Sequence, residues 1–193
     1  MEFEKRYLIV VIFISAILVG AIAIFYYPSG GPPGQRWLQD PEDDVILNFN
    51  ADYPGMIDII YAELSTNEQI LNFTLTMKDS VPESLEYGEY VQWLVLIIFE
   101  DGTAYEMYAE INSTIYEGEL SGFIREVGEY EAQPCILEHD GKTLILSAPL
   151  EGLEATKEVQ WVVQTVFEKW SGYELISNGF DFAPDEDLQR TTL

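Results

Sequence analysis

The chain has 193 residues, of which 48% are hydrophobic, and it carries 34 acidic against 9 basic side chains, a formal net charge of −25. The hydrophobic content excludes a disordered acidic tail. The charge excludes a nucleic-acid-binding protein, because too few cations are present to replace phosphate counterions, and anionic lipid headgroups also repel the chain. Suitable partners are cations, basic proteins and neutral ligands such as glycans. A simpler explanation of the charge is solubility, or adaptation to a salty or acidic exterior.

The N-terminal segment predicts a membrane anchor. Residues 7–27 form a run of 21 residues without a charged side chain, which spans roughly 30 Å of hydrocarbon at about 1.5 Å per residue. Lys5 and Arg6 precede this run, and the next basic residue is Arg36. The positive-inside rule then places residues 1–6 in the cytoplasm and the rest of the chain outside. We therefore expect a single-pass protein of the cell membrane with an extracellular C-terminal domain.

A cleaved signal peptide is the alternative for the same segment. Ala21-Ile22-Ala23 has the small-x-small form that signal peptidase requires. The apolar run continues beyond Ala23 to Tyr27, which favours an uncleaved anchor over removal of residues 1–23. Both alternatives place the following domain outside the cell, and mass spectrometry of the native N-terminus distinguishes them.

Proline and glycine after the anchor predict a linker. The sequence PSGGPPG begins at Pro28, and we assign residues 28–39 to the linker on this composition. Residues 40–193, about 150 residues, are then one extracellular domain, which is long enough to bury a core. Cys135 is the only cysteine, so an internal disulfide is excluded and stability must come from the core.

The hydrophobic period of this domain is mostly two, as in β-strands with one wet face. Strands are expected at residues 57–65, 69–78, 103–111 and 143–148. Residues 93–99 are apolar on both faces, which is typical of a central buried strand. Asp101-Gly102 and Asp140-Gly141 predict hairpin turns beside these runs, since both residue types tolerate positive φ.

Residues 158–170 fit two patterns. Val159, Val162, Val163 and Val166 lie at helical spacing, whereas Val159, Trp161 and Val163 alternate as in a strand. Valine, threonine and aromatic residues dominate the segment, which favours a strand. We therefore predict an all-β fold, an antiparallel β-sandwich of eight to nine strands preceded by one N-terminal transmembrane helix.

The order of these segments resembles a known fold family. The segments are MIDIIYA at 56–62, ILNFTLTM at 70–77, YVQWLV at 90–95, KTLILSAPL at 142–150 and DFAPD at 181–185. This order, over about residues 50–187, is similar to the DOMON-like and family 9 carbohydrate-binding-module-like β-sandwiches of extracellular and archaeal surface proteins. The resemblance implies the sandwich fold, and a fold alone does not imply a ligand.

The sequence does not show the groups that hydrolytic catalysis requires. A catalytic triad needs a base, which is usually histidine. His139 is the only histidine, and it lies beside the predicted turn at Asp140 together with Cys135. Neither CxxC, HExxH nor a phosphate-binding glycine loop occurs. We therefore expect a protein that is not an enzyme and that needs no cofactor, apart from a calcium ion considered next.

Two acidic clusters could hold calcium, which takes six to eight converging oxygen ligands. The clusters are Asp40, Glu42, Asp43 and Asp44, and Asp181, Asp185, Glu186 and Asp187. Neither has the spacing of an EF-hand, and a solvated run of charge is the alternative for both. We place a structural metal site at Asp181, Asp185 and Asp187, because Asp181 and Asp185 belong to the closing segment of the family resemblance.

The aromatic content, 12 Tyr, 10 Phe and 4 Trp, suggests a platform for a glycan, since sugars stack their apolar faces on such rings. The candidate ligand-binding residues are Tyr90, Tyr105, Tyr108 and Trp161. Packing in the core is the alternative for each ring. Tyr108 is the strongest candidate, because it lies on the polar phase of its strand.

Two further kinds of site follow from short motifs. Asn72 and Asn112 begin Asn-x-Ser/Thr sequons and are candidates for N-glycosylation. A haem-binding DOMON-type domain, a remote alternative, would need axial ligands. The outer-domain candidates for that role are Met56, Met77, Met107 and His139.

The leading functional prediction is a membrane-anchored, extracellular, non-catalytic β-sandwich module that binds a cell-envelope protein or a glycan. The alternative is a structural component of a cell-surface assembly, such as an anchor for a surface layer or filament, which would bind protein through a sheet edge or an acidic face. A haem- or calcium-binding DOMON-type domain is the remote alternative. The membrane contact is through residues 7–27, and no nucleic acid partner is expected.

Overall fold

The structure is a computed structural model that describes residues 37–48, 55–67, 70–114, 118–149, 158–184 and 188–192. These residues form thirteen β-strands and no helix. The strands are β1 (Trp37–Gln39), β2 (Ile46–Asn48), β3 (Ile59–Asn67), β4 (Ile70–Met77), β5 (Glu89–Phe99), β6 (Ala104–Asn112), β7 (Ser121–Glu126), β8 (Gln133–Pro134), β9 (Ile136–Asp140), β10 (Thr143–Pro149), β11 (Glu158–Ser171), β12 (Glu174–Ala183) and β13 (Gln189–Thr192). The predicted anchor at residues 7–27 lies outside the described residues. Within them, a helix suited to crossing a membrane is not found.

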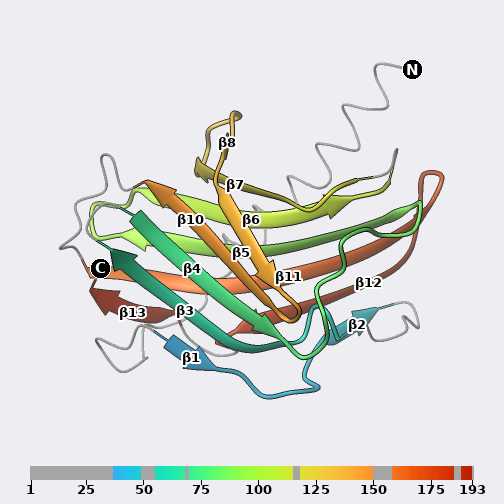
Figure 1. The fold of residues 1–193 in the computed structure, drawn as a ribbon, viewed down its shortest axis with the longest axis horizontal. Coiled ribbons are helices and arrows are strands. Elements are labelled where there is room, and N and C mark those ends of the chain that lie inside the picture. Colours follow the sequence, from blue (N-terminus) through green and yellow to red (C-terminus); the bar gives the residue numbers. More distant parts are fainter. Residues whose placement is uncertain are drawn as a thin grey trace.

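The strands form two antiparallel sheets that cross one another (Figure 1). Sheet A has the order β1-β3-β4-β10-β9. Sheet B has the order β2-β12-β11-β5-β6-β7-β8, and β13 also pairs with β11. In Figure 1, β3, β4 and β10 of sheet A lie in front of the long strands of sheet B. The fold is therefore all-β and β-sandwich-like, as the period-two pattern predicted.

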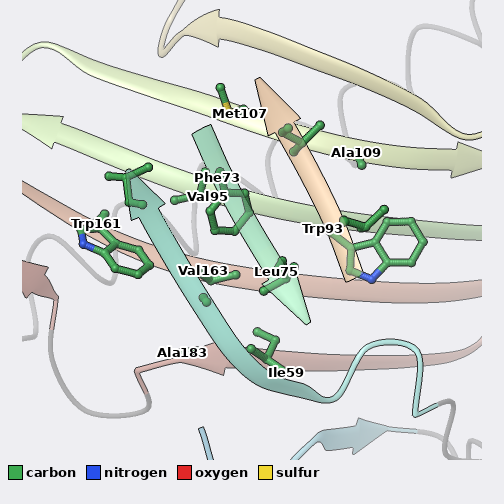
Figure 2. Close-up of a cluster of buried hydrophobic side chains, with 14 of the residues drawn as sticks. Ile59, Phe73, Leu75, Trp93, Val95, Met107, Ala109, Trp161, Val163 and Ala183 are labelled. Carbon is green, nitrogen blue, oxygen red and sulfur yellow. The ribbon is translucent and has the colours of Figure 1, made fainter. Parts of the chain in front are cut away.

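One core fills the space between the two sheets (Figure 2). Alternate residues of β4, among them Phe73 and Leu75, point toward Trp93 and Val95 of β5, which are also fully buried. Burying a side chain of this size stabilises a fold by about 1.5–3 kcal/mol. Because successive side chains of a strand point to opposite faces, the same strands carry a second, outer set of residues.

The ambiguous segment at residues 158–170 is a strand, as predicted. β11 pairs with β5 from Val159 opposite Phe99 to Lys169 opposite Glu89, and with β12 on its other edge. Both edges of β11 are therefore satisfied by backbone hydrogen bonds along most of its length. The β-branched and aromatic residues of the segment fit this pleated environment.

The structure corrects the boundary of the linker. Trp37–Gln39, which the composition assigned to the linker, form β1 and pair with residues 61–63 of β3. The described residues also form more strands than the eight or nine expected. The additional ones are β1, β2, β8 and β13, which have only two to four residues each. Such short edge strands are not visible in a hydrophobic period, which needs several alternations to be recognised.

Both predicted hairpin turns are present in the structure. Gly102 has φ +86° between β5 and β6, and Gly141 has φ +57° between β9 and β10. Asp101 does not adopt the positive φ that the prediction allowed. Its Oδ1 instead accepts a hydrogen bond of 2.9 Å from the backbone N–H of Thr103, which stabilises the turn locally.

Candidate functional site

Two of the four rings predicted to bind a ligand lie on the core side of sheet B. Trp161 is fully buried, and Figure 2 shows it among the core side chains. Tyr105 is half-buried against the same core and packs edge-on against Phe99, with ring centroids 5.9 Å apart at 84°. Both rings therefore take part in core packing, which was the alternative explanation for them.

The other two rings lie on the outer face of sheet B, but little of either is open to solvent. Tyr108 is 8% exposed and belongs to a small apolar cluster with Leu94 and Leu96. Its ring lies 5.5 Å from the ring of Phe123, and burial raises its pKa to about 12. Tyr90 is 4% exposed. Tyr108 faces away from the core, as its position on the polar phase of the strand predicted. The strand pattern could not predict that neighbouring side chains bury the ring on this outer face.

Charged groups are also enclosed on this outer face. The Nε of Arg125 donates a hydrogen bond of 2.6 Å to Oε2 of Glu106, and the guanidinium lies 5.6 Å from the centre of the Tyr108 ring. Tyr90 donates its hydroxyl to Oε2 of Glu110 at 3.2 Å. Burial raises the pKa of Glu110 and of Glu168. This face therefore has the character of a second, partly polar interior.

The outer face of sheet A is polar and partly open to solvent along its whole width. Its central residues are Asn72, Thr74 and Thr76 of β4 with Thr143, Ile145 and Ser147 of β10, all of them half-buried. Ser147 donates its hydroxyl to Oδ1 of Asn72 at 2.7 Å, and the hydroxyls of Thr76 and Thr143 are 3.2 Å apart. Hydroxyl and amide groups thus form an even surface on which further hydrogen bonds can be made.

A partly exposed aromatic pair lies at one edge of this polar face. Trp37 of β1 is 45% exposed, and its ring lies nearly parallel to that of Tyr61 of β3, at 19° with centroids 6.5 Å apart. Tyr61 donates its hydroxyl to Oε2 of Glu63 at 2.7 Å. Partial burial and this hydrogen bond raise the pKa of Tyr61 to about 12, so the hydroxyl stays protonated. This pair was not predicted, because the composition of residues 28–39 assigned Trp37 to the linker.

A cluster of carboxylates forms beneath one edge of the sandwich. Asp40 and Asp44, from the loop between β1 and β2, meet Asp181 of β12, with one carboxylate oxygen of each within 4.8 Å of the others. Asp181 is 2% exposed and lies opposite Thr165 of β11. Its Oδ2 accepts the backbone N–H of Ile59 at 2.6 Å. Two acidic clusters that are far apart in the sequence therefore contribute to one site.

The electrostatics of this cluster are unfavourable for a negative charge. Burial, followed by the charges of Asp44 and Asp58, raises the pKa of Asp181 to about 7, although backbone N–H groups of Ile59 and Phe182 act in the opposite direction. A low-dielectric surrounding and neighbouring carboxylates both favour the protonated form. A divalent cation would neutralise the same carboxylates, and oxygen-only ligands suit calcium rather than a softer metal.

Contacts of Asp43 with Asp58 and Lys78 hold the loop that carries Asp40 and Asp44 in place. Asp43 adopts φ +70°, an unusual conformation for a residue other than glycine. Its backbone N–H donates to Oδ2 of the fully buried Asp58 at 3.0 Å, and its carboxylate forms an ion pair with Lys78. Asp185 and Asp187, the other predicted ligands, lie outside the described residues, so the structure shows Asp181 of the three predicted metal ligands.

Both sequons lie on strands. Asn72 lies on the outer face of sheet A. Asn112 ends β6, and its Oδ1 accepts the Thr114 hydroxyl at 2.6 Å. Whether either is glycosylated stays a prediction.

The candidate haem ligands are spread over different environments. Met77 and Met107 are fully buried in the core, as their apolar phase predicted. Met56 is half-buried, and its carbonyl accepts the indole N–H of Trp93 at 2.8 Å. His139 is exposed on the edge strand β9. These side chains are placed as packing and surface residues.

No protein-family model, curated protein or solved structure matches this chain. The fold therefore stands on the structure alone, and the similarity to DOMON-like and family 9 carbohydrate-binding-module-like domains stays a prediction from the order of the segments. Function has to be argued from the two outer faces, the carboxylate cluster and the charge of the chain.

Proposed function

We propose that this chain is a non-catalytic module that binds a glycan of the cell envelope on the outer face of sheet A, and that residues 7–27 anchor it to the membrane with the sandwich outside the cell. The observation that carries the proposal is the exposed Trp37 ring, stacked on the half-buried Tyr61 beside a surface of hydroxyl and amide side chains. Such a combination offers ring faces for the apolar side of a sugar and hydrogen-bonding groups for its hydroxyls.

Charge supports a neutral ligand. With a net charge of −25, the chain repels polyanions at long range, whereas an uncharged glycan is not affected. Glu63, which accepts the hydroxyl of Tyr61, also places a carboxylate beside the rings as an acceptor for sugar hydroxyls. An envelope protein is the other proposed occupant of this face, and the experiment below separates the two.

The environments of Cys135 and His139 support binding rather than catalysis. Cys135 packs against the core, and burial raises the pKa of its thiol to about 11, so a reactive thiolate is disfavoured at neutral pH. His139 lies nearby on β9 but is exposed at the edge of the sheet. Neither residue therefore has the surroundings of an activated nucleophile.

A glycan array probed with the purified extracellular domain tests the proposal. We expect specific binding that Trp37→Ala weakens at least about tenfold, with little change in melting temperature because Trp37 is at an exposed edge. Tyr130→Ala is the matched control, since Tyr130 is the most exposed described aromatic residue, at 91%, and lies in the loop between β7 and β8. Silence on the array together with co-purification of an envelope protein would replace the glycan by a protein partner or a surface scaffold.

A second proposal concerns calcium. We propose that a calcium ion bound by Asp40, Asp44 and Asp181 stabilises the sandwich by tying the loop between β1 and β2 to β12. The observation that favours it is the convergence of these three carboxylates on one point, with Asp181 almost fully buried. Calcium needs further oxygen ligands, which backbone carbonyls and water commonly supply.

Calcium titration followed by thermal unfolding tests this second proposal. At a concentration about 100-fold above its Kd, calcium should add about 2.7 kcal/mol of stability. Asp181→Asn should abolish the gain, while Asp79→Asn, which removes one charge from an exposed position, should preserve it. An absence of heat on titration, with an unchanged melting temperature, would rule the site out.

A further inference from the structure

A small pocket lies where β5, β11 and β13 meet at one end of sheet B. Its volume is about 270 Å³, and its lining combines apolar and charged side chains. The lining residues are Ile98, Phe99, Glu100, Glu158, Val159, Gln160 and Arg190. Pockets for drug-sized ligands are usually about 300–1,000 Å³, so this one suits a smaller molecule.

The pairing of the strands shows which side chains of the pocket lie on the same face of sheet B. Gln160 of β11 is paired with Arg190 of β13 on one side and with Ile98 of β5 on the other. Residues paired in this way point to the same face of a sheet. Arg190, Gln160 and Ile98 therefore stand in one row on the outer face of sheet B, and Glu100 and Glu158 lie at the ends of their strands beside that row.

Arg190 supplies the one positive charge among the residues that line this pocket. Its Nε is buried and donates no hydrogen bond, and no carboxylate of the described residues forms an ion pair with it. Arg125, by contrast, is paired with Glu106. At the wall of a pocket, a guanidinium that forms no ion pair with the described residues can bind an anionic group of a ligand. The planar guanidinium binds carboxylates and phosphates through two parallel hydrogen bonds, and the strong negative charge of the chain disfavours the doubly charged phosphate.

The two glutamates decide what else the ligand must carry. A simple anion would meet the repulsion of Glu100, Glu158 and a net charge of −25. A molecule that carries both a carboxylate and an ammonium group has no net charge and can satisfy Arg190 and the glutamates together. Ile98 and Phe99 also line the pocket and offer an apolar surface to a small side chain of such a molecule.

We propose that this pocket binds a small zwitterion of the α-amino acid class, with its carboxylate on Arg190 and its ammonium group facing Glu100 and Glu158. The site is separate from the glycan-binding face, which lies on sheet A, and does not depend on it. The chain would thus have a second ligand, recognised by two charges of opposite sign rather than by ring stacking.

Calorimetric titration of the full chain in a neutral detergent tests this inference. The probes are the twenty common L-amino acids, each added alone at up to about 10 mM, which detects millimolar affinity. For any that bind, the N-acetyl derivative removes the ammonium charge and the methyl ester removes the carboxylate. We expect at least one free amino acid to bind, and both blocked forms to bind at least about tenfold more weakly. Failure of all twenty to bind, or equal binding of either blocked form, would overturn the proposal.

Variants then assign the two charges to residues. Arg190→Gln and Glu158→Gln should each weaken binding of the same amino acid at least about tenfold. Arg190→Lys keeps the charge but loses the planar fork, so it should retain part of the affinity and serves if Arg190→Gln folds poorly. Glu129→Gln is the matched control, because it removes one negative charge at an exposed turn beyond β7. Unchanged affinity in both Arg190 variants would contradict the assignment.

Discussion

The outer faces of sheets A and B differ in how far their side chains are exposed to solvent and in which groups they contact. On sheet A, hydroxyl and amide groups such as those of Asn72 and Ser147 bond to one another and stay partly open to solvent. On sheet B, Leu94, Leu96 and Tyr108 are only 7–8% exposed, and the Glu106–Arg125 ion pair is enclosed beside them. Sheet A has one dry and one wet face, as antiparallel sheets commonly do, whereas the outer face of sheet B also carries buried side chains at its centre.

This difference explains why aromatic content was a poor guide to which rings are open to solvent. Three of the four predicted rings, Tyr90, Tyr108 and Trp161, are buried, and all four belong to sheet B. The partly exposed pair, Trp37 and Tyr61, belongs to sheet A. Tyr108 is covered by its long neighbours Phe123 and Arg125, whereas Trp37 lies at the edge of a face of short polar side chains. The comparison can be tested on stability as well as on binding.

The largest expected effect is from breaking the ion pair on sheet B. Arg125→Met leaves Glu106 buried without its cation, which should lower the free energy of unfolding by about 3–5 kcal/mol in urea denaturation. Changing Glu106→Gln at the same time should recover most of the loss. A loss below about 1 kcal/mol, the size expected for a solvated surface pair, would show that the two outer faces are equally wet.

Truncating one ring on each face comes next in size. Tyr108→Ala removes a ring enclosed by Phe123 and Arg125 and should cost about 3 kcal/mol. Trp37→Ala, at an exposed edge, should cost less than about 1 kcal/mol while removing glycan binding. Urea denaturation of both variants checks the contrast, and equal costs would contradict it.

The smallest expected effect concerns pH. Burial raises the pKa of Glu168, so the folded state keeps this proton to a higher pH than the unfolded state does. Stability from this group is therefore complete below about pH 4.3, the pKa of an unfolded glutamate, and is lost as the pH rises through the folded pKa. Glu168→Gln, which can still accept the indole N–H of Trp170, should be more stable than the parent chain at pH 7 but not at pH values below about 4.

The control for this pH effect is Glu174→Gln. Glu174 lies at the exposed start of β12, and its substitution removes the same charge. Urea denaturation at both pH values should show a smaller gain for Glu174→Gln than for Glu168→Gln. An equal gain at pH 7 would mean that net charge, rather than the burial of Glu168, limits stability.

Most of the long strands could be predicted, because their signal is local. Alternation along β4, β6 and β10 and the two-sided apolarity of β5 follow from the pleat of a strand, and the residues that alternate inward are those buried in the core. The choice of a strand for β11 was also confirmed, on the strength of its β-branched residues. The short edge strands were missed, since two to four residues cannot show a period.

The sequence by itself determined the all-β fold and the strong negative charge, and it singled out Asp181 as a candidate metal ligand. Only the tertiary structure brought Asp181 beside Asp40 and Asp44 and placed Arg190 at the wall of a pocket. It also decided which outer face of the sandwich leaves aromatic rings open. The physical reason is that the period of a strand reports which side chains share a face, while contacts between distant strands depend on how the two sheets pair and pack.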